Sequence, residues 1–312
     1  MIRYFFILSI FICSSCANNK KIYKVGFYNV ENLFDTIDGP NIDEEFLPNS
    51  KLNWNQVKYD EKIAHINQVI QSLDYPIILG LCEIENIKVL KDLIFSSATL
   101  KRSYGIVHHD SPDKRGIDAS FIYNKDILKL LSSGKLHVQL DEKNLKPTRD
   151  IVWAKFLSKK DTILTLVNHW PSRRGGTEKS EHKRLKAAQT AKTFIDSVLK
   201  QNPLSKIILM GDLNDYPENK APLLIKKSLN QMITKSSGSF GGTHCYRNHW
   251  GVLDHIFVSD NFAVPKSGKI NEFDYLFTQY KGKTVPFRTF GGGKYLGGYS
   301  DHLPVSIEIE IK

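Results

Sequence analysis

The chain has 312 residues, of which 41% are hydrophobic, and this apolar content excludes an intrinsically disordered protein. A formal net charge of +10 favours a polyanion or an anionic membrane surface as partner, and charge alone does not separate the two. Beyond the N-terminal segment, only Cys82 and Cys245 remain, and they form no CxxC or CxxH arrangement, so a structural zinc site is not expected. Their separation in sequence leaves open whether they pair as a disulfide.

The first residues have the pattern of a bacterial export signal. Arg3 precedes an apolar run at 4–12, and small residues then lead to Cys16. The run is far shorter than the ~20 residues of a membrane-spanning helix. We predict a lipoprotein signal peptide at 1–15, a lipidated Cys16 and a tether at 16–21. Ordinary signal cleavage and a retained anchor are the alternatives.

Residues 22–312 are predicted to form one domain, because no linker-like segment or repeat interrupts them. Apolar residues spaced three and four apart predict helices over 57–73 and 180–199. Strands alternating with helices indicate a layered α/β fold. Short runs rich in Val, Ile, Leu and Phe predict the buried strands, at 22–28, 77–81, 119–123, 152–156, 163–167, 207–210, 255–258 and 305–311. The last strand alternates apolar residues with Ser306, Glu308 and Glu310, so one of its faces is expected to meet water.

Polar residues gather where these strands begin or end. Any one cluster could be a turn or a helix cap. Six of them at strand ends instead predict one polar pocket held by a rigid scaffold. The clusters are Asn29, Glu83, Asn168 with His169, Asp212 with Asn214, Asp254 with His255, and Asp301 with His302.

Six sequence motifs contain these clusters. In their order they resemble the signature motifs of the endonuclease/exonuclease/phosphatase superfamily, over about residues 22–312. The first and third look closest to the bacterial extracellular nucleases. The resemblance implies a four-layer α/β sandwich, with two mixed β-sheets packed face to face and helices outside. The motifs are FYNVENLF at 27–34, LCEIE at 81–85, VNHWPSR at 167–173, GDLND at 211–215, LDHI at 253–256 and SDHLPV at 300–305.

The resemblance also implies a metal site. Phosphodiester hydrolysis needs a cation on the phosphoryl oxygens and a positioned water. Mg²⁺ prefers hard oxygen ligands and keeps several waters, so a few protein oxygens suffice. Glu83 is implied as the primary ligand, with Asn29 and Asp301 beside it, and Mn²⁺ is a possible substitute for Mg²⁺. Glu31 lies where relatives carry a second acidic group.

Five catalytic residues follow from the same resemblance. Asp212 would orient or deprotonate the attacking water, while Asn214 holds the water or the phosphate. His302 would lie against the phosphate, paired with the carboxylate of Asp254. His169 would stabilise the pentacovalent phosphorane or protonate the leaving oxygen. Whether Asp212 or the His302–Asp254 pair is the general base stays open.

Substrate binding is expected from Asn168 and from Arg173 and Arg174, which precede the flexible pair Gly175–Gly176. The glycine-rich segment 290–299 lacks the features of a P-loop and could either approach the substrate or be mobile. Weaker site candidates are Arg115, Asp118, Arg149 and Asp150. Ordinary surface or core roles are expected of the remaining histidines, His65, His108, His109, His137, His182, His244 and His249.

The sequence therefore predicts an exported, lipid-anchored, Mg²⁺-dependent phosphodiesterase. A nuclease acting on DNA or RNA is the leading interpretation, with nucleic acid and, through Cys16, a membrane as partners. The chain is expected to be a monomer without a protein partner. Two alternatives are a phospholipid, sphingomyelin or inositol-phosphate phosphoesterase using the same site, and a non-catalytic surface lipoprotein. The DNA or RNA preference, the endo or exo mode and the membrane leaflet are not predicted.

Overall fold

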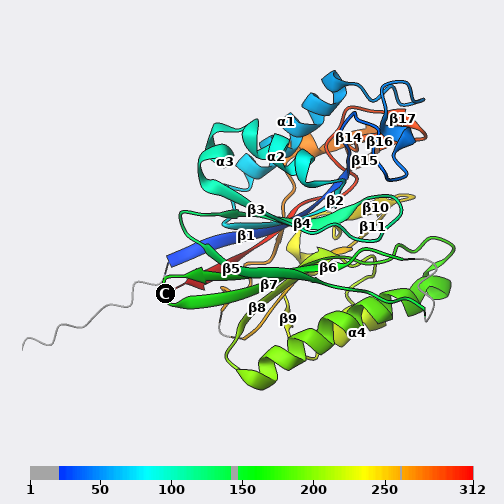
Figure 1. Cartoon of the computed structure of the whole chain (residues 1–312). Coiled ribbons are helices and arrows are strands. Elements are labelled where there is room, and N and C mark those ends of the chain that lie inside the picture. The colour runs from blue at the N-terminus through cyan, green and yellow to red at the C-terminus, as the bar shows by residue number, and fades with distance from the viewer. Residues whose placement is uncertain (1–20, 142–146, 261, 312) are drawn as a thin grey trace, which may run out of the picture.

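Two six-stranded sheets dominate the computed structural model, which describes residues 21–141, 147–260 and 262–311 (Figure 1). The predicted signal peptide and Cys16 lie outside these described residues, as does the tether except for Lys21, where the first strand begins. Among the described residues, no helix has the length and apolar character needed to cross a membrane.

The first sheet has the strand order β13-β18-β1-β2-β4-β3. Its central pair, β1 and β2, is parallel, and the other pairs are antiparallel, so the sheet is mixed. The strands are β1 (Lys21–Leu33), β2 (Ile78–Ile84), β3 (Tyr104–His108), β4 (Asp118–Asn124), β13 (Lys269–Ile270) and β18 (Val305–Ile311).

The second sheet repeats this arrangement in the order β5-β6-β7-β8-β12-β9. Here β7 and β8 form the parallel pair, again at the centre, with antiparallel neighbours. The strands are β5 (Lys129–Leu136), β6 (Ile151–Ser158), β7 (Asp161–His169), β8 (Lys206–Asp212), β9 (Asn230–Gln231) and β12 (Asp254–Val258).

The sheets pack face to face through a shared apolar core. Gly80 of β2 shows how closely they approach, because a Cβ atom placed there would lie 2.5 Å from Met210 Sδ and 2.6 Å from Val167 Cγ2. Phe121 of β4 meets Phe156 of β6 edge to face, with ring centroids 6.3 Å apart. Only a residue without a side chain fits at Gly80, so the spacing between the layers depends on it.

Helices cover the two outer faces. Figure 1 shows α1 (Gln56–Ser72), α2 (Ile87–Phe95) and α3 (Ala98–Ser103) outside the first sheet, and α4 (Thr177–Gln201) outside the second. With α4, the short α5 (Lys220–Ile225) contributes to an apolar cluster on the outer face of the second sheet. The predicted four-layer sandwich, helix–sheet–sheet–helix, is confirmed.

Most strand and helix predictions agree with the structure to within a few residues. Several short elements were not predicted, including α2, α3, α5, β3, β5 and β9. Three small hairpins were also missed: β10 (His244–Tyr246) with β11 (His249–Gly251), β14 (Phe277–Tyr280) with β15 (Lys283–Pro286), and β16 (Phe290–Gly291) with β17 (Lys294–Tyr295).

Two details correct or settle expectations from the sequence. The polar face of β18 is only partly wet, because Glu308 is exposed but Ser306 is buried against Asn271, whose Nδ2 donates to Ser306 Oγ at 3.0 Å. Cys82 is fully buried in β2, and both it and Cys245 carry free thiols, so the disulfide left open by the sequence does not form.

Candidate active site

The predicted site residues meet because the central strands of both sheets end at the same place. In the parallel pair β7/β8, His169 lies opposite Asp212, and the antiparallel neighbour β12 places Asp254 opposite the same Asp212. In the other sheet, β1 places Asn29 opposite Cys82, directly before Glu83. At this place a hydrogen bond from Asn29 Nδ2 to Asp212 Oδ2, at 3.1 Å, joins the two sheets.

Backbone irregularities re-aim side chains at these strand ends. Four non-glycine residues here have left-handed φ angles, namely 54° at Glu31, 53° at Asn32, 64° at Glu83 and 50° at Asn214. The first three coincide with register shifts in the pairing of β1 with β2 and of β2 with β4. Such conformations cost free energy and gather at functional sites, where the surrounding structure holds them.

His302 and Asp254 form a short polar contact at the centre of the site. Nδ1 of His302 lies 2.7 Å from Oδ2 of Asp254, and Nε2 of His302 lies 3.8 Å from Oδ2 of Asp212. Burial alone would lower the pKa of His302, but the carboxylates of Asp254 and Asp212 raise it well above its usual value. The His302 side chain is therefore an imidazolium near neutral pH, with Nε2 facing Asp212.

The pKa of Asp212 is raised as well, which for a carboxyl group favours the uncharged form. Burial, together with the neighbouring charges of Asp254 and Glu83, raises the pKa of Asp212 to about 7, against the lowering effect of His302. The backbone N–H of Asn214 donates to Asp212 Oδ1 at 2.9 Å. A carboxylate with its pKa near neutrality suits general-base chemistry.

His169 lies on the other side of Asp212. Its Nε2 is 3.7 Å from Asp212 Oδ2 and 3.8 Å from Glu83 Oε1. Burial, followed by the charges of Arg149 and Arg115, lowers the pKa of His169 well below its usual value, so this imidazole is neutral near pH 7. Arg149 also positions it, because its guanidinium donates to the backbone carbonyls of His169 (3.2 Å) and Trp170 (2.9 Å).

The three predicted metal ligands offer the oxygen atoms that Mg²⁺ prefers. Glu83 Oε2 accepts the N–H of Asn32 at 2.9 Å, whereas Oε1 has no hydrogen bond to the described residues, with His169 Nε2 3.8 Å away. Asn29 Oδ1 accepts the N–H of Glu31 at 3.0 Å and keeps a second lone pair. Asp301 Oδ1 lies 4.0 Å from His302 Nε2. This donor set fits a hard divalent cation.

Imidazole nitrogens lie close to these oxygens. His244, Asp301 and His302 each bring one nitrogen or oxygen atom to within 4.8 Å of the others, and Asp212, Asp254 and His302 do the same. An imidazolium His302 has no lone pair for a metal, and carboxylate and carbonyl oxygens suit Mg²⁺ and Mn²⁺ better than imidazole does, so the oxygen atoms of Glu83, Asn29 and Asp301 remain the candidate ligand set.

The two asparagines differ in their surroundings. Asn214 Nδ2 donates to the carbonyl of Trp170 at 3.0 Å and lies at the rim of the site beside Asp212. Asn168 is fully buried, with Nδ2 donating to Met210 O at 3.1 Å and Oδ1 accepting from Trp170 Nε1 at 3.0 Å. These internal hydrogen bonds favour a positioning role for Asn168 over substrate contact.

The arginines expected to bind substrate lie on the loop before α4. The Arg173 guanidinium stacks over the ring of Tyr216, 4.2 Å from its centroid, and Arg174 is exposed. Left-handed φ angles at Gly175 and Gly176, 85° and 117°, let the chain turn into the helix. No contact joins either arginine to the catalytic side chains among the described residues.

The weaker candidates are spread around the site. Arg115 Nη2 donates to Asn32 Oδ1 at 2.8 Å, so it lies beside the Glu83 ligand. Both carboxylate oxygens of Asp118 have protein partners, His108 Nε2 at 3.1 Å and the N–H of Ser111. Asp150 is removed from the site and pairs with Lys135 and His137.

Sequence reasoning missed two residues of the site. His244, which was expected to have an ordinary role, packs against His302 with ring centroids 4.8 Å apart and the ring planes tilted by 42°, and its Nε2 lies 3.8 Å from Asp301 Oδ2. Burial lowers the pKa of His244 to about 4, and the charge of His302 acts in the same direction. Arg288 donates from Nη2 to Asp301 Oδ2 at 3.0 Å. Neither residue follows a predicted strand, which was the signal used to find the others.

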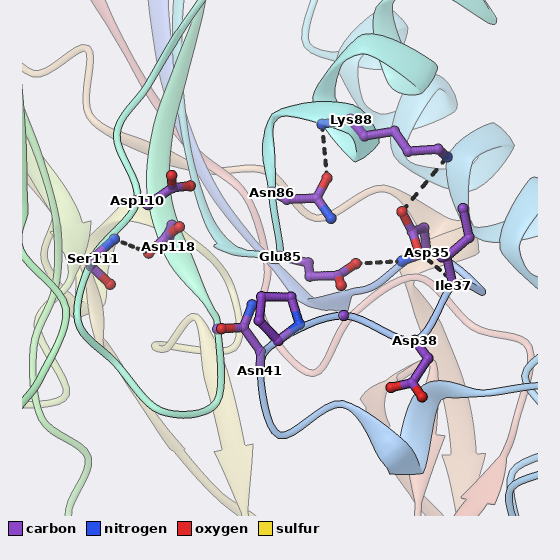
Figure 2. A pocket seen from close by; sticks show the side chains of 13 residues that line it. Asp35, Ile37, Asp38, Asn41, Glu85, Asn86, Lys88, Asp110, Ser111 and Asp118 are labelled. Carbon is purple, nitrogen blue, oxygen red and sulfur yellow. Dashed lines mark hydrogen bonds and ion pairs between the residues drawn. The ribbon is translucent and has the colours of Figure 1, made fainter.

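An acidic cavity of about 430 Å³ lies beside the site. Figure 2 shows Asp110, Ser111 and Asp118 on one side of it, and Asp35, Ile37 and Lys88 on the other. Burial, with the charges of Asp35 and Asp43, raises the pKa of Glu85 to about 7. Carboxylates predominate here, so the cavity disfavours an anionic group but could bind hydroxyl groups.

Comparison with known proteins gave a match at the level of a family. A family model described as Endonuclease/Exonuclease/phosphatase family matches residues 24–311. A search of curated proteins gave no match.

Solved structures show the same fold. The catalytic domain of human nocturnin with a bound sulfate anion is 15% identical, with a TM-score of 0.60, and the match covers 93% of this chain and 97% of that one. A family protein from Bacteroides thetaiotaomicron is 18% identical (TM-score 0.61; 94% and 96% covered). A mannosyl-6-phosphatase from the same organism is 18% identical (TM-score 0.60; 92% and 99% covered).

Proposed function

The chain belongs to the endonuclease/exonuclease/phosphatase family, and on that premise we propose that it is a Mg²⁺-dependent phosphodiesterase acting on nucleic acid. Phosphoesterase chemistry is the common ground of that family. The observation that carries the proposal is the chain of contacts from Asp254 through His302 to Asp212, which holds an imidazolium and a carboxylate within 3.8 Å of each other.

A divalent cation held by Glu83, Asn29 and Asp301 would neutralise charge on the phosphoryl oxygens. Asp212 takes the proton of the attacking water at its Oδ2, because its raised pKa makes it a base that works near neutral pH. Asn214, bonded to the Trp170 carbonyl and to Asp212, keeps that water in line.

The two histidines act on the phosphate in different protonation states. His302 presents the N–H of its imidazolium Nε2 to a phosphoryl oxygen, and Asp254 prevents it from releasing the proton. Its raised pKa argues against His302 as the general base, so the proposal assigns that role to Asp212. His169, neutral and held by Arg149, is placed to donate a hydrogen bond to the leaving oxygen.

Nucleic acid is proposed as the substrate because the net charge of +10 attracts a polyanion. Arg115, beside the metal ligands, and Arg173 with Arg174, on the loop before α4, provide guanidinium groups for successive phosphates. A nucleic acid with several bound phosphates would use all three.

A second candidate is a small hydroxylated phosphoester, such as a sugar or inositol phosphate. The acidic cavity beside the site favours it. Carboxylate groups of the cavity can accept hydrogen bonds from hydroxyl groups, and its amide groups can also donate hydrogen bonds to them. The fold neighbour named as a mannosyl-6-phosphatase has activity of this kind. We also propose that the protein is exported and anchored to a membrane through Cys16. Phospholipid or sphingomyelin headgroups therefore remain candidate substrates.

A panel of DNA, RNA, sphingomyelin and inositol phosphates, assayed with Mg²⁺ and with EDTA, tests the proposal. For a nuclease, affinity for a duplex oligonucleotide should fall steeply with salt, at a log–log slope of about −0.9 per bound phosphate. Arg173→Ala combined with Arg174→Ala should flatten that slope by up to ~2 units on all sequences alike. A flat salt response would reject the nuclease in favour of the small-phosphoester enzyme.

A further inference from the structure

Arg288 places a guanidinium group among the metal-site carboxylates. Its Nη2 donates both to Asp301 Oδ2 (3.0 Å) and to Glu31 Oε1 (2.9 Å), and its Nε donates to the same Glu31 oxygen at 3.1 Å. The charge of Arg288 also acts on Glu83 and on His244. Its side chain is 45% exposed, so the group is open to a ligand from solvent.

Glu31 is already fully engaged by protein donors. It is buried, and besides Arg288 it accepts the backbone N–H of Thr289 at 2.6 Å and that of Phe290 at 3.4 Å. All of these donors come from one segment, residues 288–290. A carboxylate with its oxygens used in this way anchors a loop, whereas a metal ligand needs an open oxygen such as Glu83 Oε1.

A second buried charged residue, Lys62, forms hydrogen bonds to both ends of the same loop. Lys62 of α1 is fully buried, and its Nζ donates to Thr289 Oγ1 and to the carbonyl of Tyr299. Phe290 packs on Trp54, with ring centroids 5.2 Å apart. At Gly298, a Cβ atom would lie 2.2 Å from the carbonyl oxygen of Phe287, so the two ends of the loop pack tightly. Both ends of the glycine-rich segment, which follows Arg288, are thus anchored, and this restricts the position of that residue.

We propose that Arg288 is a phosphate-binding residue of this active site and that Glu31 is the positioning residue that holds it there. The inference rests on the proposed phosphoesterase function and deepens it. Two nitrogens of the guanidinium are used by Glu31 and Asp301, and none of these contacts uses Nη1. Among the described residues Nη1 has no hydrogen-bond acceptor, so it can donate to a non-bridging phosphoryl oxygen, which a planar, permanently charged group does well.

The charge distribution around the site supports this orientation of the phosphate. Asp110, Asp118 and Glu85 line the acidic cavity on one flank, which disfavours an anion there. Arg288 lies with Asp301, on the segment that runs from β15 into β18. A phosphate at the metal ligands is therefore attracted toward Arg288. The rest of the substrate, which carries the hydroxyl groups or the leaving group, then lies on the side of the acidic cavity.

Calorimetric titration with inorganic phosphate, at a fixed Mg²⁺ concentration, tests the inference without depending on turnover. Arg288→Ala should weaken phosphate binding by about 10- to 100-fold, the range for losing a charge-assisted hydrogen bond. The phosphate affinity of Arg288→Lys should lie between those of Arg288→Ala and the unaltered protein. Lys294→Ala removes the same charge from an exposed position on the same loop and should change the affinity less than about 2-fold. Melting temperatures of all variants show whether each remains folded.

The role of Glu31 is tested by non-additivity. Glu31→Gln should weaken phosphate binding in the unaltered background and have no further effect in the Arg288→Ala background, because it acts only through Arg288. Millimolar guanidinium should restore binding to the Arg288→Ala variant, while the same concentration of sodium should not.

Unchanged phosphate affinity in a folded Arg288→Ala variant would overturn the inference, and so would absence of phosphate binding by the unaltered protein. Hydrolysis of bis(4-nitrophenyl) phosphate is measured in parallel. If the protein hydrolyses no phosphoester but its phosphate affinity depends on Arg288, the proposed function fails and the anion-binding assignment stands.

Discussion

Replacing Arg184 with methionine should destabilise the protein strongly through a buried ion pair next to the catalytic loop. Arg184 lies on α4 with no exposed surface, and its Nε is 2.9 Å from Asp215 Oδ1, the carboxylate that follows Asn214. The remaining guanidinium nitrogens donate to Ser180 Oγ at 2.8 Å and to Thr177 O at 2.9 Å. The pair therefore joins the helix to the loop that carries Asn214 and directly follows Asp212 at the end of β8.

The size of the effect follows from burial. Asp215 is 1% exposed, and burial already raises its pKa, against the opposing effect of Arg184. Methionine fills much of the arginine volume but leaves the Asp215 carboxylate buried and uncompensated. Breaking a buried pair in this way costs about 3–5 kcal/mol of unfolding free energy. With an unfolding entropy of about 2.1 cal/mol/K per residue, that corresponds to a fall in melting temperature of roughly 5–8 °C for a domain of this size.

Urea unfolding of the variant measures the loss directly. Asp215→Asn introduced together with Arg184→Met should recover part of it, because the second change removes the stranded charge. Lys220→Met is the matched control, since its ion pair with Glu181 of α4 is on the surface and should contribute nothing measurable. An Arg184→Met variant within about 1 kcal/mol of the unaltered protein would refute the reasoning.

His302→Ala and Asp212→Asn should each lower kcat by at least ~10²-fold while leaving the fold intact, because each removes a positioned acid or base group; near-normal turnover in a folded variant would locate the site elsewhere. Exhaustive chelation of a soluble fragment starting near Lys20 should abolish phosphodiester hydrolysis, and Mg²⁺ or Mn²⁺ should restore it; full activity without metal would reject the metal site. Cys16→Ser should release the protein from membranes, and persistent association would indicate a retained anchor. Burial lowers the pKa of His255 from 6.5 to about 4, so acid protonates the unfolded chain first. The free energy of unfolding should fall by up to about 3 kcal/mol between pH 6.5 and 4, and His255→Gln should flatten that dependence.

The strand ends were predictable because their signal is local. An apolar run followed by Asn, Asp, Glu or His is visible in the sequence, and the parallel pairs β1/β2 and β7/β8 bring such ends together. What the sequence did not indicate is how far a strand continues past its apolar run. β1 extends to Leu33 through left-handed residues at Glu31 and Asn32, since pairing with β2 resumes after a bulge.

His244 and Arg288 were missed for a different physical reason. Each lies on a segment without strong periodicity, at a small hairpin and at a glycine-rich loop, and each reaches the site through long-range packing alone. His244 forms an isolated bridge with His302, and Arg288 is held by a carboxylate 257 residues away in sequence. No local pattern encodes such a pairing, because its free energy arises only once both sheets are assembled.

Lys62 is predictable in one respect and not in another: the sequence indicates that it is buried but not which residues it contacts. Within the predicted helix, the buried positions Tyr59, Ile63 and Ile66 follow the three-and-four spacing, and Lys62 falls on the same face. A charged residue on an apolar helix face must find partners inside the protein, because burying it alone would be too costly. The sequence therefore contains the requirement for a buried polar network under α1. Only the structure identifies its members as Thr289 and the Tyr299 carbonyl, and so connects this helix to the loop that presents Arg288.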